Sequence, residues 1–344
     1  MGSKLRANLQ RNETMTNFNV AVFSSKTYDK QSFEQGSPSN IQYEYLEPRL
    51  SMDTVKLADG FDGICAFVND DLDADVLSKL HEYGIKALVL RCAGFNNVDL
   101  ESAKKLGIRI ARVPAYSPEA VAEHTIALVM TLNRKLHKAY NRTKEDNFSL
   151  QGLLGFNLHG KTVGLIGTGK IGLATARILN GFGVKLLASD PVESNEAKIL
   201  GVSYVSFEEL IEQADIISLH CPLNEGTQHI LDCKAINRMK SGVMIVNTGR
   251  GALIDSQCLV DNLKSGKIGY LALDVYEQES ELFFEDRSDS IIQDDVFQRL
   301  LTFPNVLITG HQGFFTQEAL AQIANTTHYN LTCFSEGKAC ENEL

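Results

Sequence analysis

The feature that most constrains this chain is a glycine-rich turn between an apolar strand and a helix. Residues 162–166 are apolar and β-branched at both ends, a pattern that predicts a short buried strand. The pattern G-x-G-x-x-G follows at Gly167, Gly169 and Gly172. Residues 171–179 then carry a helical pattern that ends in a second glycine-rich stretch. This order of strand, glycine turn and helix is typical of a dinucleotide-binding unit.

The residues around this turn predict which dinucleotide binds. In such units the first glycine makes the tight turn, the second lets the backbone approach a pyrophosphate, and the third lets the helix pack on the strand. The helix N-terminus offers N–H groups and a positive dipole end to the phosphates. A second apolar strand, 184–188, leads to Asp190, an acceptor for the hydroxyls of an adenine ribose. Because its carboxylate would repel a 2′-phosphate, we expect NAD rather than NADP.

Length and composition exclude several classes of protein. At 344 residues, two domains are expected rather than one. The net charge of −10 argues against nucleic-acid and anionic-membrane partners. No apolar run approaches a membrane span and the N-terminus lacks a signal-peptide core, so we expect a cytoplasmic protein. The seven scattered cysteines predict reduced thiols. Residues 1–14 form a polar leader that we leave out of the fold argument.

The rest of the chain alternates between predicted strands and helices. Before the glycine turn, strands are predicted at residues 19–24, 62–68, 86–91 and 108–113. After Asp190, strands are predicted at residues 215–220, 243–247, 268–274 and 305–309. Continuous apolar strands separated by helices are typical of parallel sheets.

Two long helices connect these regions. Ser117 is a good N-cap and Pro118 a good first residue, so one helix is predicted to run to about residue 144 and to cross between domains. The other, 316–336, is predicted to return to the first domain. His124, within the first helix, is interpreted as a packed, hydrogen-bonded histidine between domains. The acidic stretch 69–75 is interpreted as a charged loop and helix start rather than a metal site.

Polar side chains follow several predicted strands on the carboxyl side, where ligands bind in open α/β sheets. Arg250, Glu279 and His311 each come after a different strand. A guanidinium suits a carboxylate and a polarised carbonyl, and a histidine can hold or give a proton near neutral pH. A carboxylate beside the imidazole would favour its protonated form. A nicotinamide supplies the hydride for carbonyl reduction, so no metal is expected.

Nine ordered stretches carry a resemblance to a known family. They are FVNDD, LRCAGFNNVD, VPAYSPEAVAEH, GTGKIG, LHCPL, VNTGRGALID, DVYEQE, FFED and GHQGF. From Asn19 to the C-terminus the sequence resembles the D-isomer-specific 2-hydroxyacid dehydrogenase family, and most closely its fermentative, D-lactate-forming members. The resemblance implies an α/β fold of two doubly wound domains. A Rossmann NAD-binding domain, 116–315, is inserted into a flavodoxin-like substrate (catalytic) domain, 15–115 and 316–344, which closes over the cofactor.

The resemblance also implies a set of site residues. The catalytic residues would be Arg250, Glu279 and His311. The cofactor contacts would be Gly167, Gly169, Lys170, Ile171, Gly172, Asp190, Cys221, Pro222, Thr227, Thr248, Gly249 and Asp274. Backbone N–H groups of Ala93 and Gly94 would bind the substrate carboxylate alongside Arg250. The aromatic rings of Phe67, Tyr116 and Phe314 would surround the substrate side chain.

The function expected on these grounds is reversible, NADH-dependent reduction of pyruvate to D-lactate by a homodimer or homotetramer. Three aromatic rings leave room for little more than a methyl group. One alternative is reduction of a larger 2-oxo acid, such as phenylpyruvate or a branched-chain acid, on the same fold. Another is an NAD-sensing interaction protein, because the family's corepressors retain the same three catalytic residue types. The absence of a long disordered tail or a basic face argues against this second alternative.

Overall fold

The structure is a computed structural model that describes residues 17–344. The leader expected at residues 1–14 lies outside this range. The chain forms two compact units: unit 1 comprises the chain up to Tyr116 together with Gln317–Leu344, and unit 2 is Ser117–Thr316. Each unit contains one parallel β-sheet, so the predicted α/β class with two doubly wound sheets is confirmed.

The sheet of unit 1 has five strands in the order β2-β1-β3-β4-β5. The strands are β1 Phe18–Val22, β2 Ile41–Tyr45, β3 Gly63–Ala66, β4 Ala87–Leu90 and β5 Arg109–Ala111. This is the flavodoxin-like order, with the chain reversing direction across the sheet between β1 and β3. Strand β2 has no counterpart in the sequence prediction, because IQYEY alternates apolar and polar residues at a sheet edge and forms no apolar run.

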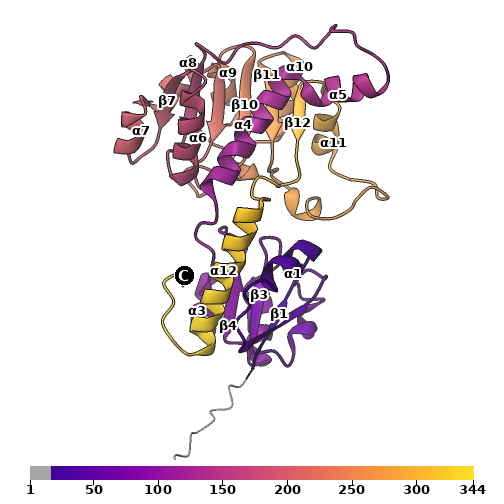
Figure 1. Ribbon diagram of the computed structural model, residues 1–344, viewed down its shortest axis with the longest axis vertical. Helices are drawn as coiled ribbons and strands as arrows, with labels where there is room; N and C mark the ends of the chain where they lie inside the picture. Colours follow the sequence, from indigo (N-terminus) through magenta and orange to yellow (C-terminus); the bar gives the residue numbers. More distant parts are fainter. Residues whose placement is uncertain (1–16) are drawn as a thin grey trace, which may run out of the picture. The chain divides into compact units, whose positions relative to one another are not determined.

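The helices of unit 1 are α1 Thr27–Phe33, η1 Val55–Ala58, α2 Ala74–Glu82, α3 Leu100–Leu106 and α12 Gln317–Ser335. Helix α12 packs against α1 and β4, so the end of the chain covers strands formed near its beginning (Figure 1). Phe33, Ala324 and Leu331 belong to the apolar core on this face of the sheet.

The sheet of unit 2 has seven strands in the order β12-β11-β10-β9-β6-β7-β8. The strands are β6 Thr162–Ile166, β7 Lys185–Ser189, β8 Ser203–Tyr204, β9 Ile216–Leu219, β10 Val243–Asn247, β11 Ile268–Leu273 and β12 Val306–Ile308. Counted from β6, this is the Rossmann order with one strand added. The order reverses between β6 and β9, and ligands bind at such a switch point.

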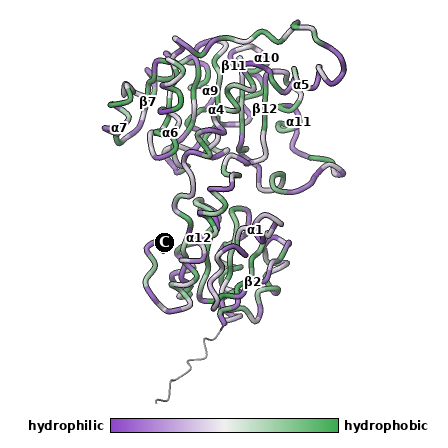
Figure 2. Tube along the Cα trace, in the orientation of Figure 1, coloured by the Kyte–Doolittle hydropathy of each residue, from purple (hydrophilic) through white to green (hydrophobic). Residues whose placement is uncertain are grey.

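Helices cover both faces of this sheet. They are α4 Pro118–Arg134, α5 Leu136–Lys144, α6 Lys170–Asn180, α7 Asn195–Ile199, α8 Phe207–Gln213, α9 Cys233–Arg238, α10 Gln257–Lys264 and α11 Asp295–Leu301, with short 3₁₀ turns η2 Gly251–Leu253 and η3 Glu279–Glu281. Side chains of α4 and α6 share one apolar core, and those of α8, α9, α10 and α11 share another. In Figure 2, the strands and helices of this unit include green segments, which mark their hydrophobic residues.

The single long helix predicted from residue 118 to about 144 is wrong. The structure divides it at Lys135, whose backbone is left-handed at φ 52°, into α4 and α5. A residue with left-handed backbone ends a helix. The sequence at Lys135 gives no sign of a helix end, because the residue is not a glycine and no proline follows it. About half of the residues of helix α4 are buried, whereas α5 has no buried residue. The break at Lys135 therefore separates a helix that packs into the core from one that lies on the surface.

The prediction of reduced thiols holds for five cysteines and is wrong for two. Cys65, Cys92, Cys221, Cys333 and Cys340 are free, but Cys233 and Cys258 are joined in a disulfide. The two cysteines are 25 residues apart, so spacing gave no signal. They meet because α9 and α10 follow the neighbouring strands β9 and β10.

None of the helices in residues 17–344 is both long and apolar enough to cross a membrane.

Candidate active site

The glycine turn between β6 and α6 has the shape that a pyrophosphate requires. Gly167 has φ +97°, and a Cβ there would lie 2.7 Å from the backbone nitrogen of Cys221. A Cβ on Gly172 would lie 2.2 Å from the carbonyl oxygen of Gly167. A Cβ on Gly169 would meet no atom of the described chain within 4 Å. The first and third glycines are therefore required by packing, and the second faces open space.

Helix α6 begins directly after this turn. Its N-cap is Gly169, which has no side chain to cap the first N–H groups, and Lys170 and Ile171 are its first two residues. N–H groups at a helix N-terminus bind anions, and the helix dipole adds to the attraction. The structure therefore fits a dinucleotide phosphate at the predicted position.

Asp190 lies at the carboxyl end of β7 and is bonded to the glycine turn. Its Oδ2 accepts hydrogen bonds from the backbone N–H of Thr168, at 2.6 Å, and from the Thr168 hydroxyl, at 3.1 Å. Its Oδ1 accepts one from the N–H of Val192 at 2.9 Å. An ionised carboxylate has about four acceptor positions, so Asp190 can hold the turn and still accept from a ribose hydroxyl.

The segment after β9 contains Cys221, Pro222 and Thr227. The Thr227 hydroxyl donates to the carbonyl oxygen of Pro222 at 2.6 Å and accepts from the N–H of Asn224 at 2.9 Å, which folds the segment into a compact turn. Burial raises the pKa of the Cys221 thiol to about 11, so this thiol stays protonated at neutral pH. It can serve as a small apolar contact rather than as a nucleophile.

His220, which precedes Cys221, provides a pH-dependent contribution to stability. Burial lowers the pKa of His220 from 6.5 to about 4, and its Nε2 lies 2.9 Å from the Ser218 hydroxyl. Between these two pKa values the unfolded chain binds a proton that the folded chain does not. We therefore expect the free energy of unfolding to decrease as the pH falls from 6.5 to 4, by on the order of 1–3 kcal/mol from this group.

Chemical denaturation of the cofactor-free protein across that range measures this contribution. His220→Gln should lose stability less steeply with falling pH than the wild type, because glutamine does not titrate. His81→Gln, at an exposed position of α2, should keep the wild-type slope. Parallel slopes for wild type and His220→Gln would contradict the assignment.

Arg250 lies in a tight loop after β10. The side chain of Asn247, the last residue of the strand and fully buried, donates to the carbonyl oxygen of Arg250 at 2.8 Å and accepts from the N–H of Gly249 at 3.0 Å. The guanidinium Nη1 of Arg250 donates to the carbonyl oxygen of Gly249 at 2.7 Å. The Thr248 hydroxyl lies 2.8 Å from that of Thr125 on α4. The loop is thus held at both its backbone and its side chains.

The Arg250 loop packs directly on the segment after β11. A Cβ on Gly251 would lie 2.0 Å from the carbonyl carbon of Tyr276 and 2.4 Å from the nitrogen of Glu277. Only glycine permits this approach. The two segments therefore hold a fixed position relative to each other, which joins Arg250 to the segment that carries Glu279.

Glu279 and His311 form a close pair from neighbouring strand ends. Nδ1 of His311, after β12, lies 2.8 Å from Oε1 of Glu279, after β11, and the two side chains are 16% and 15% exposed. Oε2 of Glu279 accepts from the N–H of Tyr276 at 2.8 Å, which fixes the carboxylate. His311 has left-handed backbone, φ 53°, and its ring stands 5.5 Å from that of Phe284. Such backbone strain is concentrated at functional sites.

Asp274 holds the loop that carries His311. Its carboxylate accepts from the N–H groups of Gln312, at 2.9 Å, and Gly313, at 2.8 Å, and the N–H of His311 donates to its carbonyl oxygen at 2.7 Å. Burial tends to raise the pKa of Asp274, but hydrogen bonds from His124 and Thr309 outweigh it and keep the pKa below its usual value. His124 is hydrogen-bonded as predicted, and its partners Asp274 and Thr309 belong to unit 2.

Three of the residues predicted to contact substrate follow strands β3 and β4 of unit 1. Phe67 is 8% exposed, and its backbone N–H donates to Oδ2 of Asp70 at 2.6 Å. The guanidinium of Arg91 lies 4.6 Å from the centre of the Phe67 ring. The carbonyl oxygen of Ala93 accepts from Arg112 at 2.7 Å, and that of Gly94 accepts from the Cys92 thiol at 3.3 Å.

Asp70 and Arg91 are supporting residues that sequence reasoning missed. Arg91 is 2% exposed and donates from Nε to Oδ1 of Asp29 at 3.1 Å, and Asp70 is fully buried and accepts from the Ser24 hydroxyl at 2.6 Å. Asp70 belongs to the acidic stretch interpreted as a charged loop. Asp73 is the N-cap of α2, as that interpretation expects. Asp70 also lies in the loop, but it is buried, which the run of acidic residues did not indicate.

The two remaining aromatic residues predicted to contact substrate lie near the boundaries of the units in the sequence. Tyr116 is the last residue of the first segment of unit 1, and Phe314 belongs to unit 2, where its ring packs edge-on to that of Phe315 at 5.9 Å. Both rings are partly exposed.

Comparisons with known proteins give the class of this protein. Residues 126–313 match the family described as D-isomer specific 2-hydroxyacid dehydrogenase, NAD binding domain. The D-lactate dehydrogenase of Escherichia coli strain K12 is 55% identical over 326 residues, which cover 94% of this chain and 99% of that protein. The chain belongs to the D-isomer-specific 2-hydroxyacid dehydrogenase family.

Two solved structures extend this similarity to the fold. The apo-structure of D-lactate dehydrogenase from Escherichia coli has a TM-score of 0.87 and 52% identity, covering 95% of this chain and 99% of that one. A structure described as the pyruvate reductase of Chlamydomonas reinhardtii has a TM-score of 0.90 and 42% identity over the same shares. The predicted family resemblance is confirmed.

Proposed function

We propose that this protein is an NAD-dependent D-lactate dehydrogenase that reversibly reduces pyruvate. The observation that carries the proposal is the His311–Glu279 pair, 2.8 Å apart at the ends of β12 and β11, with Arg250 at the end of the adjacent strand β10. The 55% identity to the Escherichia coli D-lactate dehydrogenase supports the choice of substrate within the family.

The hydrogen bond between Glu279 and His311 indicates which ring nitrogen of His311 carries its proton. An ionised carboxylate only accepts hydrogen bonds, so Glu279 requires the proton on Nδ1 of His311. Nε2 is then the atom that gives a proton to the carbonyl oxygen during reduction and takes it back during oxidation. Glu279 stabilises the imidazolium that this exchange requires. Bound NADH supplies the hydride, and this chemistry calls for no metal.

Arg250 is proposed to bind the substrate carboxylate and to polarise its carbonyl. Its planar fork can form two parallel hydrogen bonds, which fixes the orientation of a small acid as well as its position. Backbone N–H groups of Ala93 and Gly94 are proposed to bind the same carboxylate. We assign substrate binding chiefly to unit 1 and NAD binding to unit 2.

Three aromatic rings, those of Phe67, Tyr116 and Phe314, are proposed to limit the size of the substrate side chain. Around a methyl group they would leave little empty space, which favours pyruvate over branched or aromatic 2-oxo acids. A methylene group is worth about 1–3 kcal/mol in such a pocket, so the preference is expected to be graded.

The cofactor is proposed to lie along the carboxyl ends of the strands of unit 2. The glycine turn and the first residues of α6 would bind its pyrophosphate, and Asp190 its adenine ribose. The remaining predicted contacts are Cys221, Pro222, Thr227, Thr248, Gly249 and Asp274. Of these, Asp274 is 1% exposed and bonded to the His311 loop, so we expect it to act mainly by holding that loop.

Replacing Asp190 should change the choice of cofactor. Asp190→Ser removes the negative charge that would repel a 2′-phosphate, so the ratio of kcat/KM for NADPH to that for NADH should rise by on the order of tenfold or more. Asp190→Asn is the matched control for the hydrogen bond to Thr168, because its amide oxygen can still accept. If the ratio is unchanged in both variants, the ribose is bound elsewhere.

The substrate assignment is tested by NADH oxidation with purified protein across 2-oxo acids of increasing side-chain size. The expected result is a maximum at pyruvate, with D-lactate but not L-lactate oxidised in reverse. A maximum at phenylpyruvate or a branched-chain acid would retain the mechanism and refute the proposed aromatic pocket. NADH binding without turnover of any acid would favour an NAD-sensing protein.

The proposal extends to a cytoplasmic homodimer or homotetramer. Five free cysteines suit a reducing compartment. The exposed side chains of Phe148, Leu150 and Leu154, close together in sequence after α5, offer an apolar surface to a second copy of the chain.

A further inference from the structure

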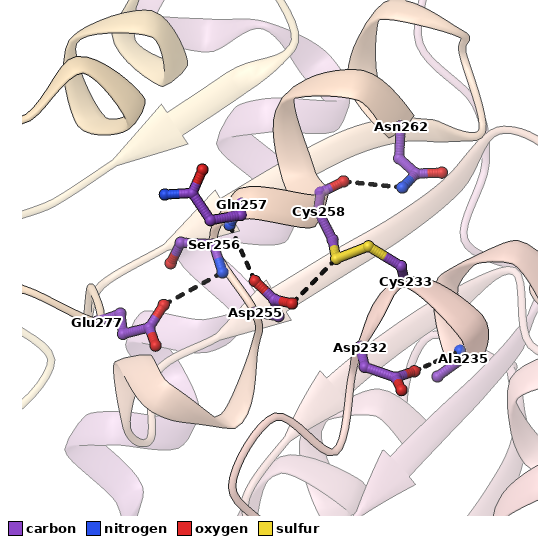
Figure 3. The surroundings of a disulfide bond; sticks show 9 residues. All are labelled: Asp232, Cys233, Ala235, Asp255, Ser256, Gln257, Cys258, Asn262 and Glu277. Atoms are coloured by element: carbon purple, nitrogen blue, oxygen red, sulfur yellow. Dashed lines mark hydrogen bonds between the residues drawn. A yellow bond between two sulfur atoms is a disulfide. The ribbon is translucent and has the colours of Figure 1, made fainter.

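The disulfide between Cys233 and Cys258 joins the start of α9 to the start of α10, which the chain enters shortly after Arg250. Cys233 is the first residue of α9, Cys258 is the second residue of α10, and their Cα atoms are 5.3 Å apart (Figure 3). Cys233 is exposed, whereas Cys258 is only 5% exposed. One end of the bond is therefore accessible from solvent and the other belongs to the core.

The two cysteines close one end of a short ladder of backbone hydrogen bonds. The N–H of His229 donates to the carbonyl oxygen of Ala252 at 2.8 Å, and that of Leu231 donates to Leu253 at 3.1 Å. The N–H of Asp255 donates back to Leu231 at 3.2 Å. The chain that leads into Cys233 is thus paired with the chain that runs from Arg250 to Cys258, so the disulfide and Arg250 lie at opposite ends of one structural unit.

Glu277 links this ladder to the segment of the proton-transfer pair. Its Oε1 lies 2.6 Å from Nε2 of His229, and its Oε2 accepts from the N–H of Ser256 at 3.2 Å. Figure 3 shows Glu277 hydrogen-bonded to the N–H of Ser256, next to Asp255 in the chain. Glu277 precedes Glu279 by two residues, so movement of residues 252–258 would reach both Arg250 and Glu279.

The surroundings of the two sulfurs differ, and this difference decides which sulfur a small-molecule thiol attacks. Oδ2 of Asp255 lies 3.1 Å from Sγ of Cys258 and would accept the S–H of the reduced thiol. Cys258 is also buried, so small-molecule reagents do not reach it directly. Exposed Cys233 is then the sulfur that reagents reach first.

We propose that Cys233 and Cys258 form a thiol–disulfide exchange site that regulates how firmly the Arg250 loop is held. A small-molecule thiolate attacks Sγ of Cys233, forms a mixed disulfide there and breaks the protein disulfide; Cys258 leaves as the thiolate, takes up a proton from water and, as the thiol, forms a hydrogen bond to Asp255. A second small-molecule thiolate attacks the mixed disulfide and releases Cys233, which is protonated. Two thiols are oxidised to one small disulfide, and the protein disulfide gains two electrons and two protons.

The kinetic effect rests on the proposed role of Arg250. The disulfide ties the far end of the ladder in the oxidised form, and reduction leaves the ladder, Asn247 and the packing of Gly251 on Tyr276 to position the loop. The glycine turn of β6 and α6, the proposed pyrophosphate site, lies outside the cross-linked segments, so NADH binding should change less than substrate binding, although Thr248 and Gly249 belong to the Arg250 loop. We expect reduction to raise the KM for pyruvate roughly three- to tenfold, with a smaller change in the Kd for NADH.

The experiment equilibrates the full-length protein with reduced and oxidised glutathione in varied ratio, with a metal chelator present. Intact mass and peptide mapping should show loss of two hydrogen atoms and a Cys233–Cys258 link under oxidising conditions. Hydrogen exchange at residues 250–258 should be slower in the linked form. Neither readout depends on turnover, so both remain informative if the proposed substrate is wrong.

Matched variants separate the bond from other thiol effects. Cys233→Ser should show the KM of the reduced wild type under every condition, and Cys258→Ser should agree with it. Cys340→Ser, a free cysteine of unit 1, should retain the full redox response. Failure to form the link, or a linked form with the exchange rates and KM of the reduced form, would overturn the proposal.

A metal effect is the remaining competing explanation. Within residues 17–344, Cys233, Asp255 and Cys258 are the one group of such side chains close enough to share an ion, with ligand atoms within 4.8 Å of one another. If added Zn²⁺ reproduces the change in KM in the reduced protein and an oxidant without Zn²⁺ does not, the group is a cation site and the exchange proposal is refuted.

Discussion

His311→Gln is expected to lower kcat for pyruvate reduction by about 10²–10⁴-fold while NADH binding is retained. Glutamine keeps a polar group of similar reach, but it cannot give a proton from the position of Nε2. The proposed sites for the pyrophosphate and the adenine ribose lie on α6 and after β7, and the substitution changes only the end of the residue-311 side chain, so the Kd for NADH should change little. Steady-state kinetics and fluorescence titration with NADH measure the two quantities.

Two further variants make this result specific. His81→Gln, the same substitution at an exposed position of unit 1, should leave kcat unchanged. Glu279→Gln should reduce kcat less than His311→Gln, because it weakens the protonated imidazole but leaves the proton donor in place. Near-normal turnover by His311→Gln would refute the assignment of the proton donor.

Much of the fold could be predicted because parallel sheets have a strong sequence signal. Strands such as β4 and β10 are buried at every residue, and they are continuous apolar runs except for Asn247 at the end of β10. Strand β2 was missed because it lies at an edge and alternates apolar with polar residues. The break at Lys135 was missed because it depends on the different burial of α4 and α5, which is a tertiary property.

The candidate site was predictable where residue chemistry alone identifies a role. The glycines of the β6–α6 turn and Asp190 match the spacing of a dinucleotide-binding unit, and Arg250, Glu279 and His311 follow three neighbouring strands. The structure brings Glu279 and His311 together directly and fixes the Arg250 loop against the same segment. The contacts of these residues with substrate and cofactor stay predictions.

Supporting residues could not be predicted in the same way. Asn247 is a single polar residue at the end of an apolar strand, and only the fold shows that its amide bonds to both Gly249 and Arg250. The buried charges of Asp70 and Arg91 and the Cys233–Cys258 disulfide likewise depend on contacts between distant segments. A polar residue that ends an apolar strand is the one such signal that sequence reading could have used.

Arg250→Lys is expected to lower kcat/KM for pyruvate by on the order of 10³-fold, or about 4 kcal/mol of transition-state stabilisation. Lysine keeps the positive charge but lacks the planar fork, so it can attract the carboxylate without fixing the carbonyl in line for reduction. The substitution also removes the hydrogen bond from Nη1 of Arg250 to the carbonyl oxygen of Gly249. Both kcat and KM should therefore worsen, unlike the effect of His311→Gln, which falls mainly on kcat.

Arg250→Gln should reduce kcat/KM further, because the charge is lost as well as the fork. Arg287→Lys, at an exposed position of the same unit, is the matched control and should be neutral. Inhibition by oxamate, a carboxylate analogue of pyruvate, measured beside the kinetics, separates the two contributions of the guanidinium. Weakened oxamate binding in Arg250→Gln, with partial retention in Arg250→Lys, would assign the charge to carboxylate binding and the fork to orientation. If Arg250→Lys keeps full activity, Arg250 contributes charge alone, and another group polarises the carbonyl.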